Sequence, residues 1–392
     1  MENRAGIPVD LALAGIDTKY YSMLNMEGFS NMMSNPSYCY KFYWLEAIVK
    51  LITESRTETT FDEIINEMIV NAWYSVTEFH IHLSGFVKGE PRDGLERAVV
   101  KLGELSGLDS QCTNTEIRNA LHEFRKELKA EKTQLTNMVP YRALAGFFYQ
   151  AKEKPDWKSV PRMVNYIQHF NQSYHKLPYT LGTSSGLQKE VYINPDWAQM
   201  IRDNATAILG WIQYEKVKWL QANNPEVPGL VYKLAPMSME RKLQQVQKLW
   251  NAVIAIHPVY DVFTEKPIQT GKFDVDHFIP WSFVMNDELW NLSPMESTLN
   301  SSKSNNLPDW DRFFKRFANT QYLLYEKMNS IEQIRNLFNA CYKYNLHSIW
   351  ASEELYRQGN KQSEFIAILE KNMRPIYDSA KRQGYRMWAF SG

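Results

Sequence analysis

The sequence predicts a mainly α-helical protein with one small unit of strand, loop, strand and helix toward its C-terminal end. Three observations predict this fold class. Apolar side chains recur at helical spacing through residues 1–255. The composition is globular, with 44% hydrophobic and 22% charged residues in a chain of 392. Residues 257–308 differ in character, because they are rich in Pro, Asp, Asn and Ser and contain two short β-like segments.

The predicted helices begin at N-capping residues, reinforced by Glu or Gln three positions later (a capping box) or by Pro at the first helical position. These start signals are Asn35-Pro36, Thr60/Glu63, Thr113/Glu116, Asn194-Pro195 and Ser330/Gln333. The first four helices are expected to extend through Leu51, Ala72, Lys132 and Trp219, and a further helix is expected over 238–254. The helix through Leu51 is apolar on nearly every side, which predicts a central position, and the Lys/Glu run at 123–132 predicts a solvated face.

Charge and cysteine content exclude several classes of protein. Lys plus Arg number 44 and Asp plus Glu number 44, so a nucleic-acid partner would have to meet a local basic face. The three cysteines, Cys39, Cys112 and Cys341, form no CxxC pair, which argues against a disulfide framework or a zinc knuckle. No signal-peptide pattern and no run of about 18 apolar residues occurs, so we expect a cytoplasmic protein without a membrane partner.

The segment Lys272–Pro308 carries the residues suited to chemistry. Residues 273–277 alternate as a strand, 278–290 form a loop, 291–295 form a second strand, and a helix follows from Glu296. On that helix Glu296, Asn300 and Lys303 share one face. If this face packs toward the first strand, Asp276, His277, Asn300 and Lys303 converge.

This set of side chains suits phosphodiester hydrolysis. Mg²⁺ prefers oxygen ligands and retains several waters, so Asp276 and the amide oxygen of Asn300 would form an open site for phosphate oxygens. The imidazole of His277 can accept a proton from water near neutral pH. Asn305 is a rival to Asn300 as metal ligand, but it lacks the shared face with Lys303.

The same stretch resembles the motif of HNH endonucleases, also called the His-Me finger or ββα-metal motif. It is most similar to the HNH domain of RNA-guided CRISPR effector nucleases and of free-standing bacterial HNH proteins. The resemblance covers about 50 of the 392 residues. The matching residues are DVDH at 274–277, Pro280, Ser282, Phe283, Asn291, Asn300, Lys303, Asn306 and Pro308.

The resemblance implies a role for each matching residue. Asp276 and Asn300 correspond to the metal ligands, His277 to the general base, and Asn291 to the asparagine that holds the histidine backbone. Lys303 corresponds to a lysine near the scissile phosphate. Many relatives bind structural zinc through paired cysteines, which are absent here, so packing from the helical regions is expected to hold the finger.

The implied function is a DNA endonuclease that uses Mg²⁺, with Mn²⁺ as a substitute, and leaves 5′-phosphate and 3′-hydroxyl ends, in bacterial defence against foreign DNA. We expect an N-terminal helical region at 1–255 for target or partner binding, an HNH nuclease domain at 256–320, and a helical C-terminal region at 321–392 with a basic end. One alternative is a nuclease subunit that works with other protein or RNA subunits, including an RNA-guided complex. The other is a non-catalytic DNA-binding protein.

The other polar residues either favour a structural role or are equally consistent with a structural and a binding role. His80 and His82 have no evident partner at metal-ligand spacing and favour a plain strand or loop. Two segments are equally consistent with a DNA surface or a solvated helix. One is the basic and aromatic stretch with Arg142, Lys152, Lys154, Lys158, Arg162 and Lys176, and the other is the basic end with Lys371, Arg374, Lys381, Arg382 and Arg386.

Overall fold

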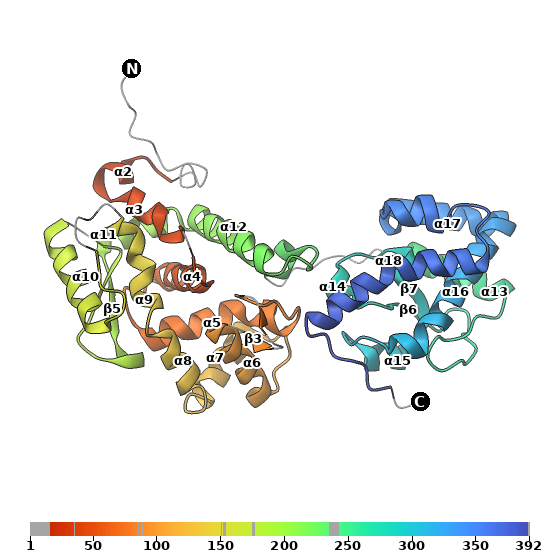
Figure 1. The fold of residues 1–392 in the computed structure, drawn as a ribbon, viewed down its shortest axis with the longest axis horizontal. Helices are drawn as coiled ribbons and strands as arrows, with labels where there is room; N and C mark the ends of the chain where they lie inside the picture. The colour runs from red at the N-terminus through yellow and green to blue at the C-terminus, as the bar shows by residue number, and fades with distance from the viewer. Residues whose placement is uncertain are drawn as a thin grey trace, which may run out of the picture. The chain divides into compact units, whose positions relative to one another are not determined.

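The computed structural model describes residues 16–34, 36–84, 86–87, 90–91, 93–149, 151, 154–174, 177–234 and 243–390. These residues are mainly helical with small sheets, which confirms the predicted fold class (Figure 1). They divide into two compact units. One comprises the described residues of Met1–Pro225 and Leu230–Pro236, and the other those of Glu226–Gly229 and Met237–Gly392. No helix in the described ranges is both long and apolar enough to cross a membrane.

The N-terminal unit is built around helix α4 (Tyr40–Thr53), whose side chains are buried almost continuously from Phe42 to Ile52. This confirms its predicted central position. Helix α5 (Phe61–Thr77) packs against it and begins at the predicted Thr60/Glu63 capping box. The remaining α-helices of the unit are α2 Lys19–Met23, α3 Met26–Ser30, α6 Gly94–Ser106, α7 Asn114–Glu123, α8 Lys129–Leu135, α9 Val139–Arg142, α10 Val160–Tyr174, α11 Pro195–Asp203 and α12 Ala205–Asn223. Short 3-10 helices span Asn31–Met33, Ala143–Phe148, Gly186–Gln188 and Leu230–Lys233.

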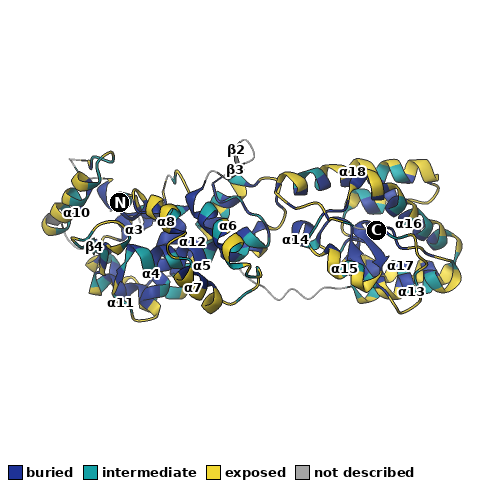
Figure 2. Ribbon diagram, turned by 90° about the horizontal axis from the view of Figure 1, so that it is seen from below, coloured by how far each residue is buried: buried dark blue, intermediate teal, exposed yellow. Residues whose placement is uncertain are grey.

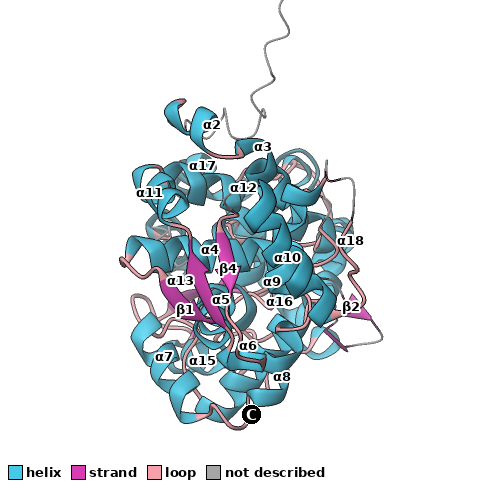
Figure 3. Ribbon diagram, turned by 90° about the vertical axis from the view of Figure 1, so that its left-hand side faces the viewer, coloured by secondary structure: helices cyan, strands magenta, loops and turns pink. Residues whose placement is uncertain are grey.

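A three-stranded antiparallel sheet covers part of this helical core (Figure 3). Its central strand is β5 (Glu190–Ile193), which pairs with β1 (Glu58–Thr60) and β4 (Tyr179–Leu181). The indole of Trp44 donates a hydrogen bond of 3.1 Å to the hydroxyl of Tyr179, and this bond ties α4 to β4. A separate two-residue pair joins β2 (Phe86–Val87) and β3 (Glu90–Pro91).

Two predicted helices of this unit are interrupted. The helix predicted from Asn194 through Trp219 is divided at Asn204, because the Asn204 side-chain amide donates to the carbonyl of Met200 and ends α11 there. The helix predicted from Thr113 to Lys132 stops at Glu123 and resumes at Lys129.

The prediction that 123–132 forms a solvated face is wrong at its end, because Lys132 is buried and paired with Asp62. Helix α4 begins at Tyr40 rather than after Asn35-Pro36. Its buried residues start at Phe42, so packing rather than the proline sets its start. Asn35 lies outside the described residues.

The C-terminal unit surrounds one β-hairpin with helices (Figure 1). Its elements are α13 Gln244–Ile256, β6 Asp274–His277, α14 Trp281–Val284, a 3-10 turn Leu289–Asn291, β7 Leu292–Met295, α15 Ser297–Lys303, α16 Trp310–Ser330, α17 Glu332–Asn345, a π-helical turn Ala351–Leu355 and α18 Gln362–Arg382. Both predicted strands, the helix after Glu296 and the helix from Trp310 are confirmed. The start predicted at 238 for α13 lies outside the described residues.

The capping box predicted at Ser330/Gln333 is wrong. Ser330 is the last residue of α16, and its hydroxyl donates to the carbonyl of Glu326. The next helix begins at Glu332, with Ile331 as its N-cap.

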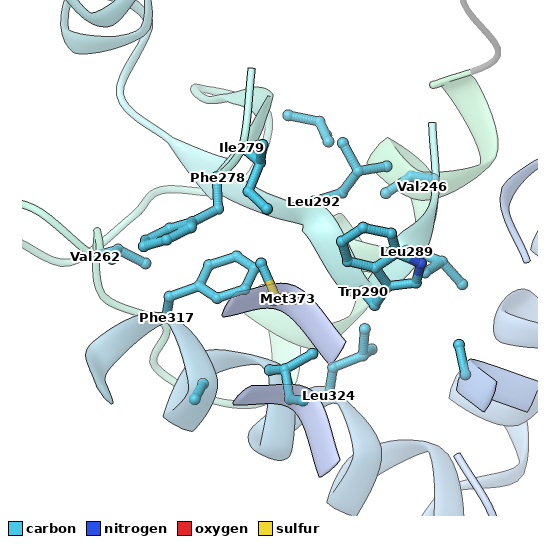
Figure 4. Close-up of a cluster of buried hydrophobic side chains, with 14 of the residues drawn as sticks. Val246, Val262, Phe278, Ile279, Leu289, Trp290, Leu292, Phe317, Leu324 and Met373 are labelled. Carbon is cyan, nitrogen blue, oxygen red and sulfur yellow. The ribbon is translucent and has the colours of Figure 1, made fainter. Parts of the chain in front are cut away.

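An apolar core lies between the hairpin and the surrounding helices (Figure 4). The rings of Phe278 and Phe317 lie 4.6 Å apart, centroid to centroid, and join the end of β6 to α16. The amide of Gln321 on α16 donates a 2.7 Å hydrogen bond to the carbonyl of Leu292 on β7. Figure 2 shows the buried residues of each unit in dark blue. The hairpin is therefore supported by helices on both sides of it in the sequence.

The domain boundaries predicted at residues 255 and 320 differ from this arrangement. Helix α13 packs against α17 and β6, and α18 packs against α16. The hairpin and its short helix are too small to bury a core of their own, so they share one with α13 and with the helices that follow residue 320.

Candidate active site on the hairpin and helix α15

The strands β6 and β7 pair in antiparallel register, with Asp274 opposite Met295 and His277 opposite Leu292. Asp274 and Asp276 lie two residues apart, so their side chains point to the same face of β6. Helix α15 packs against β6, and two polar contacts along its length fix the register between helix and strand.

The first contact joins Asp276, Lys303 and the backbone of His277. The ammonium of Lys303 lies 3.0 Å from the carboxylate Oδ2 of Asp276 and donates a 2.7 Å hydrogen bond to the carbonyl of His277. The Lys303 side chain is 1% exposed and that of Asp276 is 12% exposed. A buried ammonium needs such a partner, because burying an isolated charge costs several kcal/mol.

The second contact lies one turn earlier on α15, where the side-chain Nδ2 of Asn300 donates a 3.2 Å hydrogen bond to Oδ2 of Asp274. Because Nδ2 is engaged, the amide oxygen of Asn300 is the atom left to act as a ligand. Sequence reasoning missed Asp274 as a site residue. Its two-residue spacing from Asp276 on a strand was the available signal.

The imidazole of His277 is buried against the loop between the strands. Its Nε2 lies 3.1 Å from the carbonyl oxygen of Asn286 and 3.0 Å from the carboxylate Oδ1 of Asp287. Both neighbours are hydrogen-bond acceptors, which assigns the hydrogen of the neutral ring to Nε2 and the proton-accepting lone pair to Nδ1. Asp287 was also missed, because nothing in its spacing distinguishes it from a loop aspartate.

Asn291 is fully buried and holds the chain just after His277. Its Oδ1 accepts from the N–H of Ile279, and its Nδ2 donates to the carbonyl of Ile279, each at 2.8 Å. The expected partner was the backbone of His277. In the structure, the side chain that bonds to the His277 backbone is that of Lys303. Leu292 is the residue that pairs with His277 across the hairpin. Asn291 precedes Leu292 and therefore lies opposite the segment that follows β6.

Segments distant in sequence secure this site, as the absence of zinc-binding cysteines led us to expect. The backbone of Leu307, just after α15, donates to the carbonyl of Arg386 and accepts from the N–H of Trp388, at 2.8 and 2.7 Å. The hydroxyl of Tyr377 on α18 donates to the carbonyl of Pro308 at 2.7 Å. On the other side, Asp261 accepts from the N–H of Glu296 at the start of α15.

The donor set fits a hard divalent cation. Asp276 offers a carboxylate and Asn300 an amide oxygen, both ligand types that Mg²⁺ and Mn²⁺ accept, and Asp274 adds a second carboxylate to the same face. Within the part of the chain that the structure describes, no group of three or more His, Cys, Asp or Glu residues is arranged to hold a metal. A site built on Asp276 and Asn300 would use few protein ligands and leave positions for water and phosphate oxygens. The rival ligand, Asn305, lies beyond the end of α15.

The remaining polar candidates largely have structural partners. The Nδ1 of His82 lies 2.8 Å from a carboxylate oxygen of Glu96, within an irregular segment, as the structural reading predicted. At the basic end, Arg374 pairs with Asp378 and Arg382 pairs with Glu226, whereas Lys381 and Arg386 are exposed.

Comparison with known protein families agrees with this geometry. Residues 261–309 match the family model described as HNH endonuclease, and the matched range spans β6, β7 and α15. No significant match is found among curated proteins or among solved structures. This chain therefore carries an HNH domain, of the endonuclease type, at residues 261–309.

Proposed function

We propose that this protein is a metal-dependent endonuclease that hydrolyses phosphodiester bonds of DNA at its HNH domain. The observation that carries the proposal is the placement of Asp276, His277, Asn300 and Lys303 on one hairpin and its packed helix, inside the range that matches the HNH family. An HNH domain points to nuclease activity.

Asp276 and Asn300 would hold Mg²⁺ or Mn²⁺ through a carboxylate oxygen and an amide oxygen. Asp274 orients Asn300 by accepting its N–H, which keeps the amide oxygen directed away from Asp274. When bound, a divalent cation supplies stabilisation of negative charge on the leaving oxygen and in the transition state.

His277 would accept the proton of the attacking water. The carbonyl of Asn286 would accept the hydrogen of Nε2, so that Nδ1 of the neutral ring is the basic atom. Asp287 also faces the positive charge that develops on the ring when the proton arrives, as a carboxylate does beside a catalytic histidine. Asn291 and Lys303 keep the backbone around this residue in place.

Lys303 is the cation of the site. Its ammonium neutralises Asp276 within a buried ion pair, and it stands one turn from Asn300 on α15. A phosphate bound to a cation that Asp276 and Asn300 hold would therefore lie close to a fixed positive charge. We further propose a role in bacterial defence against foreign DNA, supported only by the similarity of the motif to RNA-guided effector nucleases.

The proposal is tested by incubating the purified full chain with supercoiled plasmid and with linear single- and double-stranded DNA, in Mg²⁺, Mn²⁺ or EDTA. We expect cleavage with Mg²⁺ and with Mn²⁺, none with EDTA, and products that end in 5′-phosphate and 3′-hydroxyl groups. Asp276→Ala should abolish cleavage, whereas Lys315→Ala, at an exposed position of α16, should not. Absence of cleavage of every substrate with both metals would contradict the proposal.

A further inference from the structure

The N-terminal unit contains a pocket of about 560 Å³ that is separate from the HNH domain. It lies between the first turn of α4, the segment around α9 and the stretch that precedes α10. Its volume falls in the range of pockets that bind small molecules. Its lining includes the charged, amide and aromatic side chains of Tyr38, Tyr40, Lys41, Asn137, Arg142 and Trp157.

The charge of the pocket is positive. Among the lining residues that the structure describes, Lys41 and Arg142 are the charged ones, and none carries a carboxylate. Among the described residues, neither cation forms an ion pair; the ammonium of Lys41 donates to the carbonyl of Ser34 at 2.7 Å, which leaves two of its three N–H donors. Burial, and next the positive charge of Arg142, lower the pKa of Lys41 to about 8. Two cations that repel each other in one pocket favour an anionic ligand.

Flat aromatic surfaces accompany this charge. Tyr38 is 40% exposed and its ring stacks on Tyr40, with centroids 5.3 Å apart and planes 14° from parallel. The guanidinium of Arg142 lies over the ring of Trp157, 5.8 Å from its centroid. Asn137 adds an amide that can both donate and accept hydrogen bonds, as the edge of a nucleobase requires. Stacked bases are held by such aromatic and guanidinium planes.

The basic and aromatic segment found in the sequence thus separates into two kinds of residue. The ammonium of Lys154 donates to the carbonyl of Phe148, and Arg162 pairs with Asp156, so both cations have partners within the protein. Arg142 and Trp157 instead face the pocket together. Lys152 and Lys176 lie outside the described residues.

We propose that this pocket binds a nucleotide, with the phosphate on Lys41 and Arg142 and the base against the aromatic rings of Tyr38 and Trp157. The nucleotide can be free or can be part of a single nucleic-acid strand, because the same chemistry recognises both. The inference is independent of the proposed nuclease function, since none of these residues belongs to the HNH domain.

The test is calorimetric titration of the full chain in EDTA, which excludes metal-dependent binding at the HNH domain. The probes are AMP, ATP, a short oligothymidylate and inorganic phosphate. We expect AMP or ATP to bind with one-to-one stoichiometry, and phosphate to bind much more weakly. Because a hydrogen bond to a charged group contributes about tenfold or more to binding, Lys41→Gln and Arg142→Gln should each weaken nucleotide binding at least about tenfold. Lys126→Gln, at an exposed position that does not line the pocket, should bind as wild type.

A second readout separates binding from a structural role. Lys41→Gln removes an unfavourable positive charge, so its melting temperature without ligand should equal or exceed that of wild type. If Lys41→Gln folds poorly, the exposed Arg142→Gln still tests binding. If oligothymidylate competes with AMP for the pocket, the natural ligand is a nucleotide within a nucleic-acid strand. If oligothymidylate does not compete with AMP, the natural ligand is a free nucleotide. The proposal is overturned if no nucleotide probe binds, if both variants bind as wild type, or if phosphate binds as tightly as AMP.

Discussion

Replacing Lys303 by Met tests the buried ion pair at the centre of the HNH domain. The substitution replaces lysine by an uncharged, apolar side chain of similar length, at a position where the side chain is 1% exposed. It removes the ammonium that lies 3.0 Å from Asp276 and the hydrogen bond to the carbonyl of His277. The carboxylate of Asp276, which is 12% exposed, is then left almost buried without a counter-charge.

Removing one partner of a buried ion pair costs about 3–5 kcal/mol, mostly because the other charge is stranded. Since Asp276 keeps some contact with solvent, we expect the lower end, about 3 kcal/mol. The double variant Asp276→Asn/Lys303→Met removes both charges and should recover most of that loss. Millimolar Mg²⁺ should stabilise Lys303→Met more than the double variant, because a cation bound at Asp276 would replace the missing ammonium.

The assay is native-state hydrogen exchange of peptides that cover β6 and β7, in urea, with and without Mg²⁺. Lys315→Met, at an exposed site in the same unit, is the matched control and should change stability by less than about 0.5 kcal/mol. A loss under about 1 kcal/mol in Lys303→Met, or a double variant as unstable as the single one, would refute the reasoning about the buried pair.

Three further predictions follow from individual contacts. Asn291→Ala removes both hydrogen bonds with Ile279 and leaves two buried backbone groups unpaired. The free energy of unfolding measured in urea should therefore fall by about 1–3 kcal/mol. An unchanged value would contradict the role of Asn291 in holding this backbone. Asp274→Ala releases the amide of Asn300, so calorimetry should show Mg²⁺ affinity reduced about 10- to 100-fold; wild-type affinity would exclude Asp274 as its positioning residue. Burial lowers the pKa of Lys233 from 10.5 to about 7 in the folded protein. Between these two pH values the unfolded chain binds more protons than the folded chain. The free energy of unfolding measured in urea should therefore rise from pH 7 to pH 9. Lys233→Met should lack this rise, and an identical pH dependence in the two proteins would count against the burial effect.

Local sequence signals predicted those fold elements that depend on adjacent residues. The capping boxes at Thr60 and Thr113 are present with both reciprocal hydrogen bonds, and the N-cap at Asn194 is confirmed. Two of the errors occurred where a side chain has two possible local uses. Asn204 bonds to a helical carbonyl and divides a continuous apolar stripe, and Ser330 ends one helix instead of beginning the next.

The candidate site was predictable to the extent that it depends on spacing. The alternation of 274–277 and the helical spacing of Asn300 and Lys303 predicted a strand and a helix whose polar faces meet. The contacts of Asp274 and Asp287 were not predictable, because they arise from how the helix and loop pack on the strand. The same holds for Lys132, which lies in a charged run and yet is buried against a helix distant in sequence.

The measurement that tests the central claim most directly is the single-turnover rate of DNA cleavage by His277→Ala at saturating Mg²⁺. Loss of a general base should slow the chemical step by about 10² to 10⁴, or roughly 2.7–5.4 kcal/mol, while Mg²⁺ and DNA still bind. His257→Ala, which changes a histidine in the same unit outside the matched range, is the control and should cleave at the wild-type rate. Cleavage by His277→Ala at the wild-type rate would contradict the assignment of His277 as the base and, with it, the proposed mechanism.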